Sequence, residues 1–163
     1  MSPRKSETSR AEDLASTLAR SPSRKSTYLF IAAALLSLVG LADSIYLTVE
    51  HLAGRSVQCT ITSGCEEVLT SAYATVGPIP LAGLGALAYF VVFSLAILAI
   101  FGNRLAGNLM LYLVGLMLAV SVYLFILQAF VLHAFCQFCL LSAAITLLLA
   151  LIVAAERFYA RAR

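Results

Sequence analysis

The chain alternates between long apolar stretches and shorter polar ones. Four apolar stretches stand out, at about residues 28–50, 80–101, 106–130 and 137–157. Each is long enough to cross the hydrocarbon core of a bilayer, which takes about 20 residues of α-helix. The pattern therefore predicts an all-α membrane protein in which the four stretches form a four-transmembrane-helix bundle.

The polar segment between the first two stretches, residues 51–79, is too long for a simple connection. Over residues 65–75 a helical pattern places on one face the side chains of Cys65, Val68, Leu69, Ala72 and Val76. We expect a short amphipathic helix that lies on the outer membrane surface as a lid. The Gly77-Pro78 pair and Pro80 would end this helix and turn the chain into the second span.

Both ends of the chain are polar. Residues 1–26 are rich in Ser, Arg and Lys and hold few apolar residues, so we expect a disordered tail. Residues 27–158 would form the membrane unit, and residues 159–163 a second short tail. The first apolar stretch begins at Tyr28, is too long for the core of a signal peptide and lacks a convincing A-x-A cleavage site. We expect it to remain in the protein as a membrane anchor.

The composition agrees with a membrane protein. Of the 163 residues, 61% are hydrophobic and only 12% are charged, whereas a soluble domain carries about 25% charged residues. The length allows one compact unit rather than several domains. The formal net charge of +3 gives no basic stripe of the kind that nucleic-acid binding requires.

The positions of Lys and Arg predict the orientation of the spans. With four spans, Arg55 alone falls on one side, and on the other side fall Arg4, Lys5, Arg10, Arg20, Arg24, Lys25, Arg104, Arg157, Arg161 and Arg163. Loops on the cytoplasmic side of a membrane carry an excess of these residues. We therefore expect both termini in the cytoplasm and the long loop on the exoplasmic side.

All four cysteines lie at or near that exoplasmic side. Cys59 and Cys65 are in the long loop, and Cys136 and Cys139 are where the fourth span begins. An even number of cysteines that face the outside suits disulfide chemistry in an oxidising compartment.

The Cys136 and Cys139 pair forms a C-x-x-C motif at a helix N-terminus. Residues three apart share one face of a helix, so the two thiols can approach closely enough to bridge. The unpaired N–H groups and the dipole of a helix N-terminus favour a thiolate, more strongly at Cys136 than at Cys139. Two unrelated buried cysteines and a zinc site are alternatives, although four-cysteine zinc sites usually use C-x-x-C twice and the other pair here is C-x5-C.

Two cysteine pairs in these places suggest a relay by thiol–disulfide exchange. The pair in the loop can meet a soluble partner, and the pair at the helix mouth can meet an electron acceptor dissolved in the lipid. The alternative is a loop that is pinned by one static disulfide, which would leave the second pair unexplained.

The stretch "CTITSGCEEVLTSAYATVGPIPLAGLGALAYF", followed by "FCQFC" at the start of the fourth span, resembles the vitamin K epoxide reductase family. The similarity covers about residues 28–157 and includes the loop cysteine pair, a serine six residues after its second cysteine, a Gly-Pro turn and the membrane C-x-x-C. The C-x5-C spacing is similar to the bacterial branch of the family, and we expect no fused thioredoxin-like domain.

The resemblance implies a role for each of these residues. Cys136 and Cys139 would be the active-site pair beside a quinone, menaquinone or ubiquinone, with Cys139 facing its ring. Cys59 and Cys65 would be the shuttle pair: Cys65 forms a mixed disulfide with a DsbA- or thioredoxin-like partner, and Cys59 then attacks Cys136. Ser71 matches the family's serine near the quinone, with an ordinary helix serine as the alternative. Ser71 lies about 120° around the expected helix from Cys65, so both reach one pocket only if Cys65 is at the helix rim.

The resemblance also implies the overall function. The protein would reoxidise a separate DsbA- or thioredoxin-like protein outside the bacterial cytoplasmic membrane and pass the electrons to quinone, which supports disulfide formation in exported proteins. Leu81 and Ala143 stand where eukaryotic members hold the vitamin with Asn and Tyr, which weakens the case for epoxide reduction. The alternatives are quinone or vitamin K epoxide reduction as the main role, a DsbB-like oxidase, whose C-x-x-C lies in its first exoplasmic loop, and a non-enzymatic scaffold or metal carrier.

Two further polar residues near the expected site have open interpretations. Asp43 lies in the outer half of the first span, where a carboxylate is costly and often functional. It could accept or relay the protons of the quinone, or it could hydrogen-bond to neighbouring spans. His133 lies three residues before Cys136 and could stabilise a thiolate or serve as a polar anchor.

Overall fold

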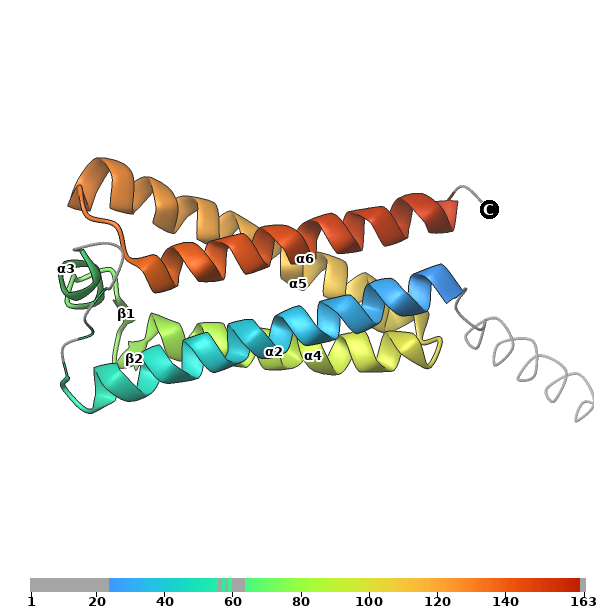
Figure 1. Ribbon diagram of the computed structural model, residues 1–163, viewed down its shortest axis with the longest axis horizontal. Coiled ribbons are helices and arrows are strands. Elements are labelled where there is room, and N and C mark those ends of the chain that lie inside the picture. Colours follow the sequence, from blue (N-terminus) through green and yellow to red (C-terminus); the bar gives the residue numbers. More distant parts are fainter. Residues whose placement is uncertain (1–23, 56, 58, 60–63, 162–163) are drawn as a thin grey trace, which may run out of the picture.

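The structure, a computed structural model, describes residues 24–55, 57, 59 and 64–161. Its elements, in chain order, are α2 (Arg24–Leu52), α3 (Cys65–Leu69), β1 (Thr75–Val76), β2 (Ile79–Pro80), α4 (Leu81–Ile100), α5 (Arg104–Leu127), η1 (Gln128–Leu132) and α6 (Gln137–Arg161). The long helices α2, α4, α5 and α6 run side by side, and α3 and the strands lie at one end of them (Figure 1). This arrangement confirms the predicted four-helix bundle with a short helix between the first two spans.

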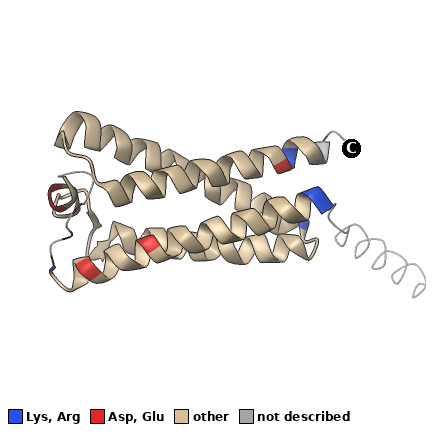
Figure 2. Ribbon diagram, in the orientation of Figure 1, with Lys and Arg blue, Asp and Glu red and all other residues tan. Residues whose placement is uncertain are grey.

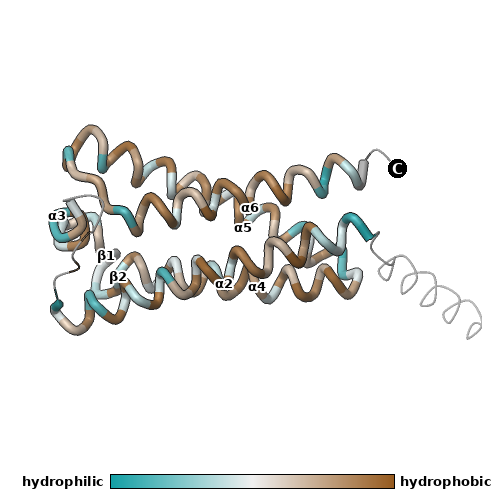
Figure 3. The backbone as a smooth tube through the Cα atoms, in the orientation of Figure 1, coloured by the Kyte–Doolittle hydropathy of each residue, from teal (hydrophilic) through white to brown (hydrophobic). Residues whose placement is uncertain are grey.

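All four long helices are apolar and long enough to cross a membrane. Figure 3 shows apolar residues along the length of the bundle and hydrophilic residues mainly near its two ends. Helix α2 begins at Arg24, so residues 24–26 are helical, and the rest of the expected N-terminal tail lies outside the described residues. Many large apolar side chains on the outer faces of the helices are exposed, as is required of surfaces that contact lipid.

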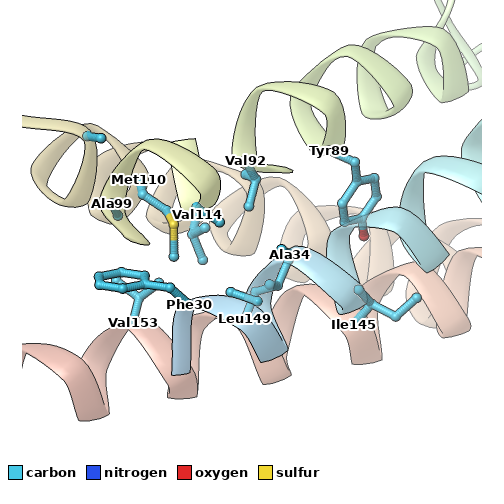
Figure 4. Close-up of a cluster of buried hydrophobic side chains, with 13 residues drawn as sticks. Phe30, Ala34, Tyr89, Val92, Ala99, Met110, Val114, Ile145, Leu149 and Val153 are labelled. Atoms are coloured by element: carbon cyan, nitrogen blue, oxygen red, sulfur yellow. The ribbon is translucent and has the colours of Figure 1, made fainter. Parts of the chain in front are cut away.

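The bundle core lies where the four long helices meet, and Figure 4 shows ten of its buried side chains with labels. Helices α2 and α4 pack most extensively on each other. Ala33 of α2 and Ala96 of α4 are fully buried in the core. Small side chains let two helix backbones approach closely, which is the main source of packing energy where lipid surrounds the protein.

Tyr89 of α4 links three helices. Its hydroxyl group lies 2.8 Å from Oγ of Ser142 and 3.0 Å from Oγ1 of Thr146, and it donates to the carbonyl oxygen of Ser142 at 2.9 Å. Its ring lies against Gly40 of α2, where an added Cβ would be 2.5 Å from Cε1 of the ring. Tyr89 therefore ties α4 to α6 through hydrogen bonds and needs a glycine on α2.

The lid helix is shorter than the sequence pattern predicts. Cys65 and Val68 are buried as expected, but α3 ends at Leu69 and not near residue 75, and Ala72 is exposed. The hydroxyl group of Ser71 donates to the carbonyl oxygen of Val68 at 2.7 Å. Such side-chain bonds to the last helical carbonyls compete with continuation of the helix.

A two-residue turn follows the lid and leads into α4. Strands β1 and β2 pair antiparallel, with Thr75 opposite Pro80 and Val76 opposite Ile79. The turn between them is the Gly77-Pro78 pair, in which Gly77 has a φ of 63°, a conformation that glycine adopts without strain. The predicted turn is therefore confirmed, and it forms the tip of a small hairpin rather than the end of a long helix.

The described cations are distributed unevenly between the two ends of the bundle. Arg24, Lys25, Arg104 and Arg157 lie at the end of the bundle where α2 begins and α6 ends, and Arg55 follows α2 at the opposite end (Figure 2). A short loop joins α4 to α5, and Asn103 of this loop caps the N-terminus of α5. The side-chain oxygen of Asn103 accepts a hydrogen bond from the backbone N–H of Ala106 at 3.2 Å.

The contact between Gly40 and Tyr89 leads to a prediction about stability. We expect Gly40→Ala to lower the stability by about 1–3 kcal/mol, because the ring of Tyr89 is buried and hydrogen-bonded and cannot move away from an added methyl group. The matched control is Gly115→Ala in α5, where a Cβ would meet no atom within 4 Å. Thermal unfolding in detergent should show a lower midpoint for Gly40→Ala only. Equal midpoints for the two variants would contradict the tight contact.

Candidate functional site

The structure brings all four cysteines to one end of the bundle. Cys65 and Cys136 are buried in one cluster, and Cys59 and Cys139 pack against it. Cys65 comes from the first residue of α3, and Cys136 directly precedes α6. Segments that are about 70 residues apart in the chain therefore meet, as a relay between two pairs requires (Figure 1).

The two pairs differ in their bonding. Cys59 and Cys65 form a disulfide with a Cα–Cα distance of 5.6 Å. Cys136 and Cys139 are free thiols, the first fully buried and the second partly buried. A disulfide thus lies in the same cluster as two thiols. This is the combination of groups that thiol–disulfide exchange needs.

Gly64 lets the lid approach the start of α6. It precedes Cys65, and its backbone lies against the residues just before Cys136. A Cβ at Gly64 would be 2.7 Å from the backbone nitrogen of Phe135 and 3.0 Å from its oxygen. Backbone atoms cannot move aside as a flexible side chain can, so any larger residue here would push Cys65 away from Cys136.

The segment before Cys136 has an unusual backbone. Helix α5 continues as the wider π-helical turn η1, and the chain then leaves the helix through His133, whose φ is 51°. Positive φ is uncommon for residues other than glycine, and π-helical turns are frequent at functional sites. The backbone N–H of Ala134 donates to the carbonyl oxygen of Gln128 at 3.2 Å, which closes the turn.

Gln128 also holds Cys136 directly. Its side-chain oxygen accepts a hydrogen bond from the backbone N–H of Cys136 at 2.9 Å, and its side chain is buried. Nothing in the sequence distinguishes Gln128 from the other polar residues in the spans. The only available signal was an amide within an apolar stretch eight residues before the C-x-x-C motif.

The thiol of Cys136 has a lowered pKa. The pKa of Cys136 is lowered from 9.0 to about 7, and the largest cause is the hydrogen bond from the Cys139 thiol. Burial opposes the lowering, and the backbone N–H groups of Cys139 and Phe138 add to it. The sequence predicts that the helix N-terminus favours a thiolate at Cys136. The structure adds a larger cause, the neighbouring thiol. At neutral pH a substantial fraction of Cys136 is thus the reactive thiolate.

A cavity of about 390 Å³ lies beside the cysteines. Its wall is largely apolar and draws residues from all four long helices and from the lid. Cys139 belongs to this wall, and other polar side chains in it include Asp43, Ser44, His51, Ser71 and Gln128. A mostly apolar cavity of this size with a few polar groups is typical of a site for a small organic molecule.

The remaining candidate residues, Ser71, Asp43 and His133, differ in their positions relative to the cavity. Ser71 lines the cavity because α3 ends before it, so the helical spacing from Cys65 no longer applies. Asp43 lines the cavity and is 9% exposed. His133 is exposed and absent from the cavity wall, whereas His51, which was not a candidate, is part of it.

The alternative of a metal site gains no support from the cysteines. In residues 24–55, 57, 59 and 64–161, no group of three or more His, Cys, Asp or Glu side chains is placed to hold a metal ion. Two of the four sulfur atoms are in the disulfide and cannot act as thiolate ligands in this state.

One comparison with known proteins agrees with this geometry. The sequence model of the Vitamin K epoxide reductase family matches residues 31–154, which is most of the chain. The matched region extends from α2 to α6 and contains both cysteine pairs, Gln128, Ser71 and Asp43. No curated protein matches the chain.

The close approach at Gly64 predicts that the lid shields Cys136. We expect Gly64→Ala to expose Cys136 and to raise its rate of alkylation by maleimide at least severalfold, because the added methyl group would collide with the backbone of Phe135. Gly83→Ala is the control, since its Cβ would have ordinary contacts of 3.6 Å or more. Mass spectrometry of the labelled peptide would measure the rate. An unchanged rate in Gly64→Ala would argue against a tightly docked lid.

The hydrogen bond between the two thiols predicts a shift in pH dependence. The alkylation rate of Cys136 should rise with pH through a midpoint near 7, because only the thiolate reacts. Without the hydrogen bond its pKa rises, so in Cys139→Ala the midpoint should move to higher pH. Cys139→Ser keeps a hydrogen-bond donor and should keep a low midpoint. Iodoacetamide labelling across a pH series would test this, and identical midpoints in all three proteins would exclude the proposed cause.

Proposed function

Since this chain belongs to the vitamin K epoxide reductase family, a family of membrane thiol–disulfide oxidoreductases, we propose that it oxidises a DsbA- or thioredoxin-like protein and passes the electrons to a membrane quinone. The observation that carries this proposal is the single buried cluster in which both cysteine pairs meet. One of these cysteines, Cys139, also lines the apolar cavity.

The first transfer occurs at the lid. A thiolate of the reduced partner attacks Cys65 of the Cys59–Cys65 disulfide, which forms a mixed disulfide and frees Cys59. The second thiolate of the partner then releases the partner as a disulfide and leaves Cys59 and Cys65 reduced. Two electrons have moved from the partner to the loop pair.

The second transfer occurs between the pairs. Cys59 attacks Cys136 of an oxidised Cys136–Cys139 pair, and Cys65 then attacks Cys59, so the loop disulfide forms again and the inner pair is reduced. A loop disulfide beside two free inner thiols is the state that follows this step, and it is the observed combination. The low pKa of Cys136 supports its part, because a stable thiolate is a good leaving group.

The cavity residues fit a quinone as the final electron acceptor. A quinone accepts two electrons and two protons and becomes a quinol. The apolar wall suits its ring and excludes water, Cys139 lies in the wall as the electron donor, and Ser71 is a polar group in the same wall. The hydroxyl hydrogen of Ser71 is committed to the carbonyl oxygen of Val68, so the Ser71 oxygen is free to accept a hydrogen bond.

Reduction of vitamin K epoxide as the main role receives less support. Leu81 and Ala143, which stand where eukaryotic members have hydrogen-bonding residues, both line the cavity. Neither side chain can donate a hydrogen bond to an epoxide or a carbonyl oxygen. The wall therefore lacks at these positions the polar contacts that eukaryotic members use to hold the vitamin.

The relay also requires a particular orientation. The cysteine end of the bundle has to face the oxidising side of a bacterial cytoplasmic membrane, where exported proteins form disulfides. The concentration of described cations at the opposite end supports this orientation (Figure 2). Both termini would then be cytoplasmic.

Purified protein in detergent tests the function. We would mix it with a reduced DsbA-like protein and a quinone, and follow quinol formation by absorbance. We expect turnover by the wild type and a loss of at least about 10²-fold in Cys139→Ala and in Cys65→Ala, because each breaks a covalent step. Gly115→Ala, which changes a site without neighbours, is the control and should keep full activity.

Dithiothreitol separates the two cysteine pairs. A small dithiol can reach the inner pair without the lid, so Cys65→Ala should still oxidise dithiothreitol while failing with the protein partner. Cys139→Ala should fail with both reductants. Wild-type protein that reduces no quinone with either reductant would refute the proposed function.

A further inference from the structure

Asp43 differs from the other described residues in the cavity wall, because it is the only carboxyl side chain among them. It is 9% exposed, and its Oδ2 atom is inaccessible to solvent and has no hydrogen-bond partner among the described residues. A polar atom that is buried without a partner costs free energy, and ionisable residues within membrane spans mark proton or substrate pathways. This placement therefore requires an explanation other than stability.

The neighbouring hydroxyl groups do not provide a structural explanation. The hydroxyl group of Tyr89, which also lines the cavity, is bonded to Ser142 and Thr146 instead of Asp43. The interpretation that Asp43 serves to hydrogen-bond neighbouring spans thus lacks support at its Oδ2 atom. Within the part of the chain that the structure describes, no Lys or Arg side chain lines the cavity, so no cation there pairs with the carboxyl group.

The titratable groups around Asp43 come from several elements. Tyr89 of α4 and Cys139 of α6 line the same cavity as Asp43, and Cys136 lies directly before α6. His51 lies eight residues further along α2, a rise of about 12 Å, which is too far for direct proton transfer. The part of α5 that lines the cavity contributes Ser121 but no Asp, Glu, His, Lys, Arg, Cys or Tyr side chain.

We propose that Asp43 is the proton carrier between the inner thiol pair and the quinone. It gives its proton to a quinone oxygen and takes up a proton released from Cys136 and Cys139. The step balances: the two thiols lose two electrons and two protons and form the S–S bond, and the quinone gains the same two electrons and two protons. This inference rests on the proposed function, and it adds the route of a proton that the cysteines alone do not specify.

The other groups in the wall fit this role less well. Serine and threonine hydroxyls do not ionise in this pH range, and Tyr89 is already engaged with α6. The cysteines must end as a disulfide and cannot hold protons afterwards. A carboxyl group is small and releases and regains a proton rapidly, and here it lines the same cavity as Cys139.

The first test compares the quinone step in Asp43→Asn and Asp13→Asn. Asparagine has the shape of aspartic acid but cannot deliver a proton, and Asp13 is the only other aspartate in the chain. Protein with a reduced inner pair would be mixed rapidly with quinone. We expect quinol formation to be slower by on the order of 10²-fold in Asp43→Asn and unchanged in Asp13→Asn. Exchange between the partner and the loop pair should be unchanged in both variants, which a general folding defect would not allow.

The second test needs no quinone. Infrared difference spectra would be recorded as an added chemical oxidant converts Cys136 and Cys139 to the disulfide. We expect a carboxyl band that shifts on labelling with ¹³C-aspartate and that persists in Asp13→Asn but is lost in Asp43→Asn. If Asp43→Asn does not fold, the labelled wild type and Asp13→Asn still assign the band.

The possible outcomes are distinct. A slow quinone step together with the carboxyl band supports the inference. An unchanged quinone step in Asp43→Asn, or spectra of the labelled wild type without an aspartate band, overturns it even when the wild type is active. A wild type that reduces no quinone refutes the proposed function instead, and the infrared spectra then still decide whether Asp43 exchanges a proton with the thiols.

Discussion

The backbone contact between Gly64 and Phe135 is the constraint on which the cysteine cluster depends. Because a Cβ at Gly64 would lie 2.7 Å from a backbone nitrogen, only glycine lets the lid rest directly on the start of α6. Cys65 follows Gly64 and Cys136 follows Phe135, so this one contact sets the distance between the two pairs. The hydrogen bond from Cys136 to Gln128 fixes the other side of the contact. The positions of Cys65 and Cys136 relative to each other are therefore held on both sides.

The fold followed from the sequence because it rests on simple quantities. The lengths of the apolar stretches predict the four spans, and the places of the cysteines in those stretches predict that they meet at one end. The lid was predicted less well. The apolar spacing through Ala72 and Val76 suggested a continuous helix, but the hydroxyl group of Ser71 bonds to Val68 and the Gly77-Pro78 turn pulls the chain into a hairpin. Short-range polar bonds of this kind leave no trace in the apolar pattern.

The site was predictable in its chemistry but not in its geometry. Cysteine type and spacing identified the reactive groups, and the depth of Asp43 in the first span marked it as unusual. The sequence could not show that Gln128 holds Cys136, because that bond depends on the π-helical turn and on the left-handed conformation of His133. His133 was a candidate because it is close to Cys136 along the chain, but His51 is the histidine that lines the cavity. Closeness along the chain is a poor guide to closeness in a helix bundle.

The proposed function combines two kinds of chemistry that need different surroundings. Exchange with a protein partner needs water and room, which the lid and its loop disulfide provide at the end of the bundle. Reduction of a lipid-soluble acceptor needs an apolar wall, which the spans provide. Cys136 and Cys139 lie where these regions meet, with the first in the buried cluster with Cys65 and the second in the cavity wall. Because the two thiols share a hydrogen bond, a change in the chemical state of one thiol directly affects the other. A C-x-x-C motif at the N-terminus of α6 thus connects the two regions directly.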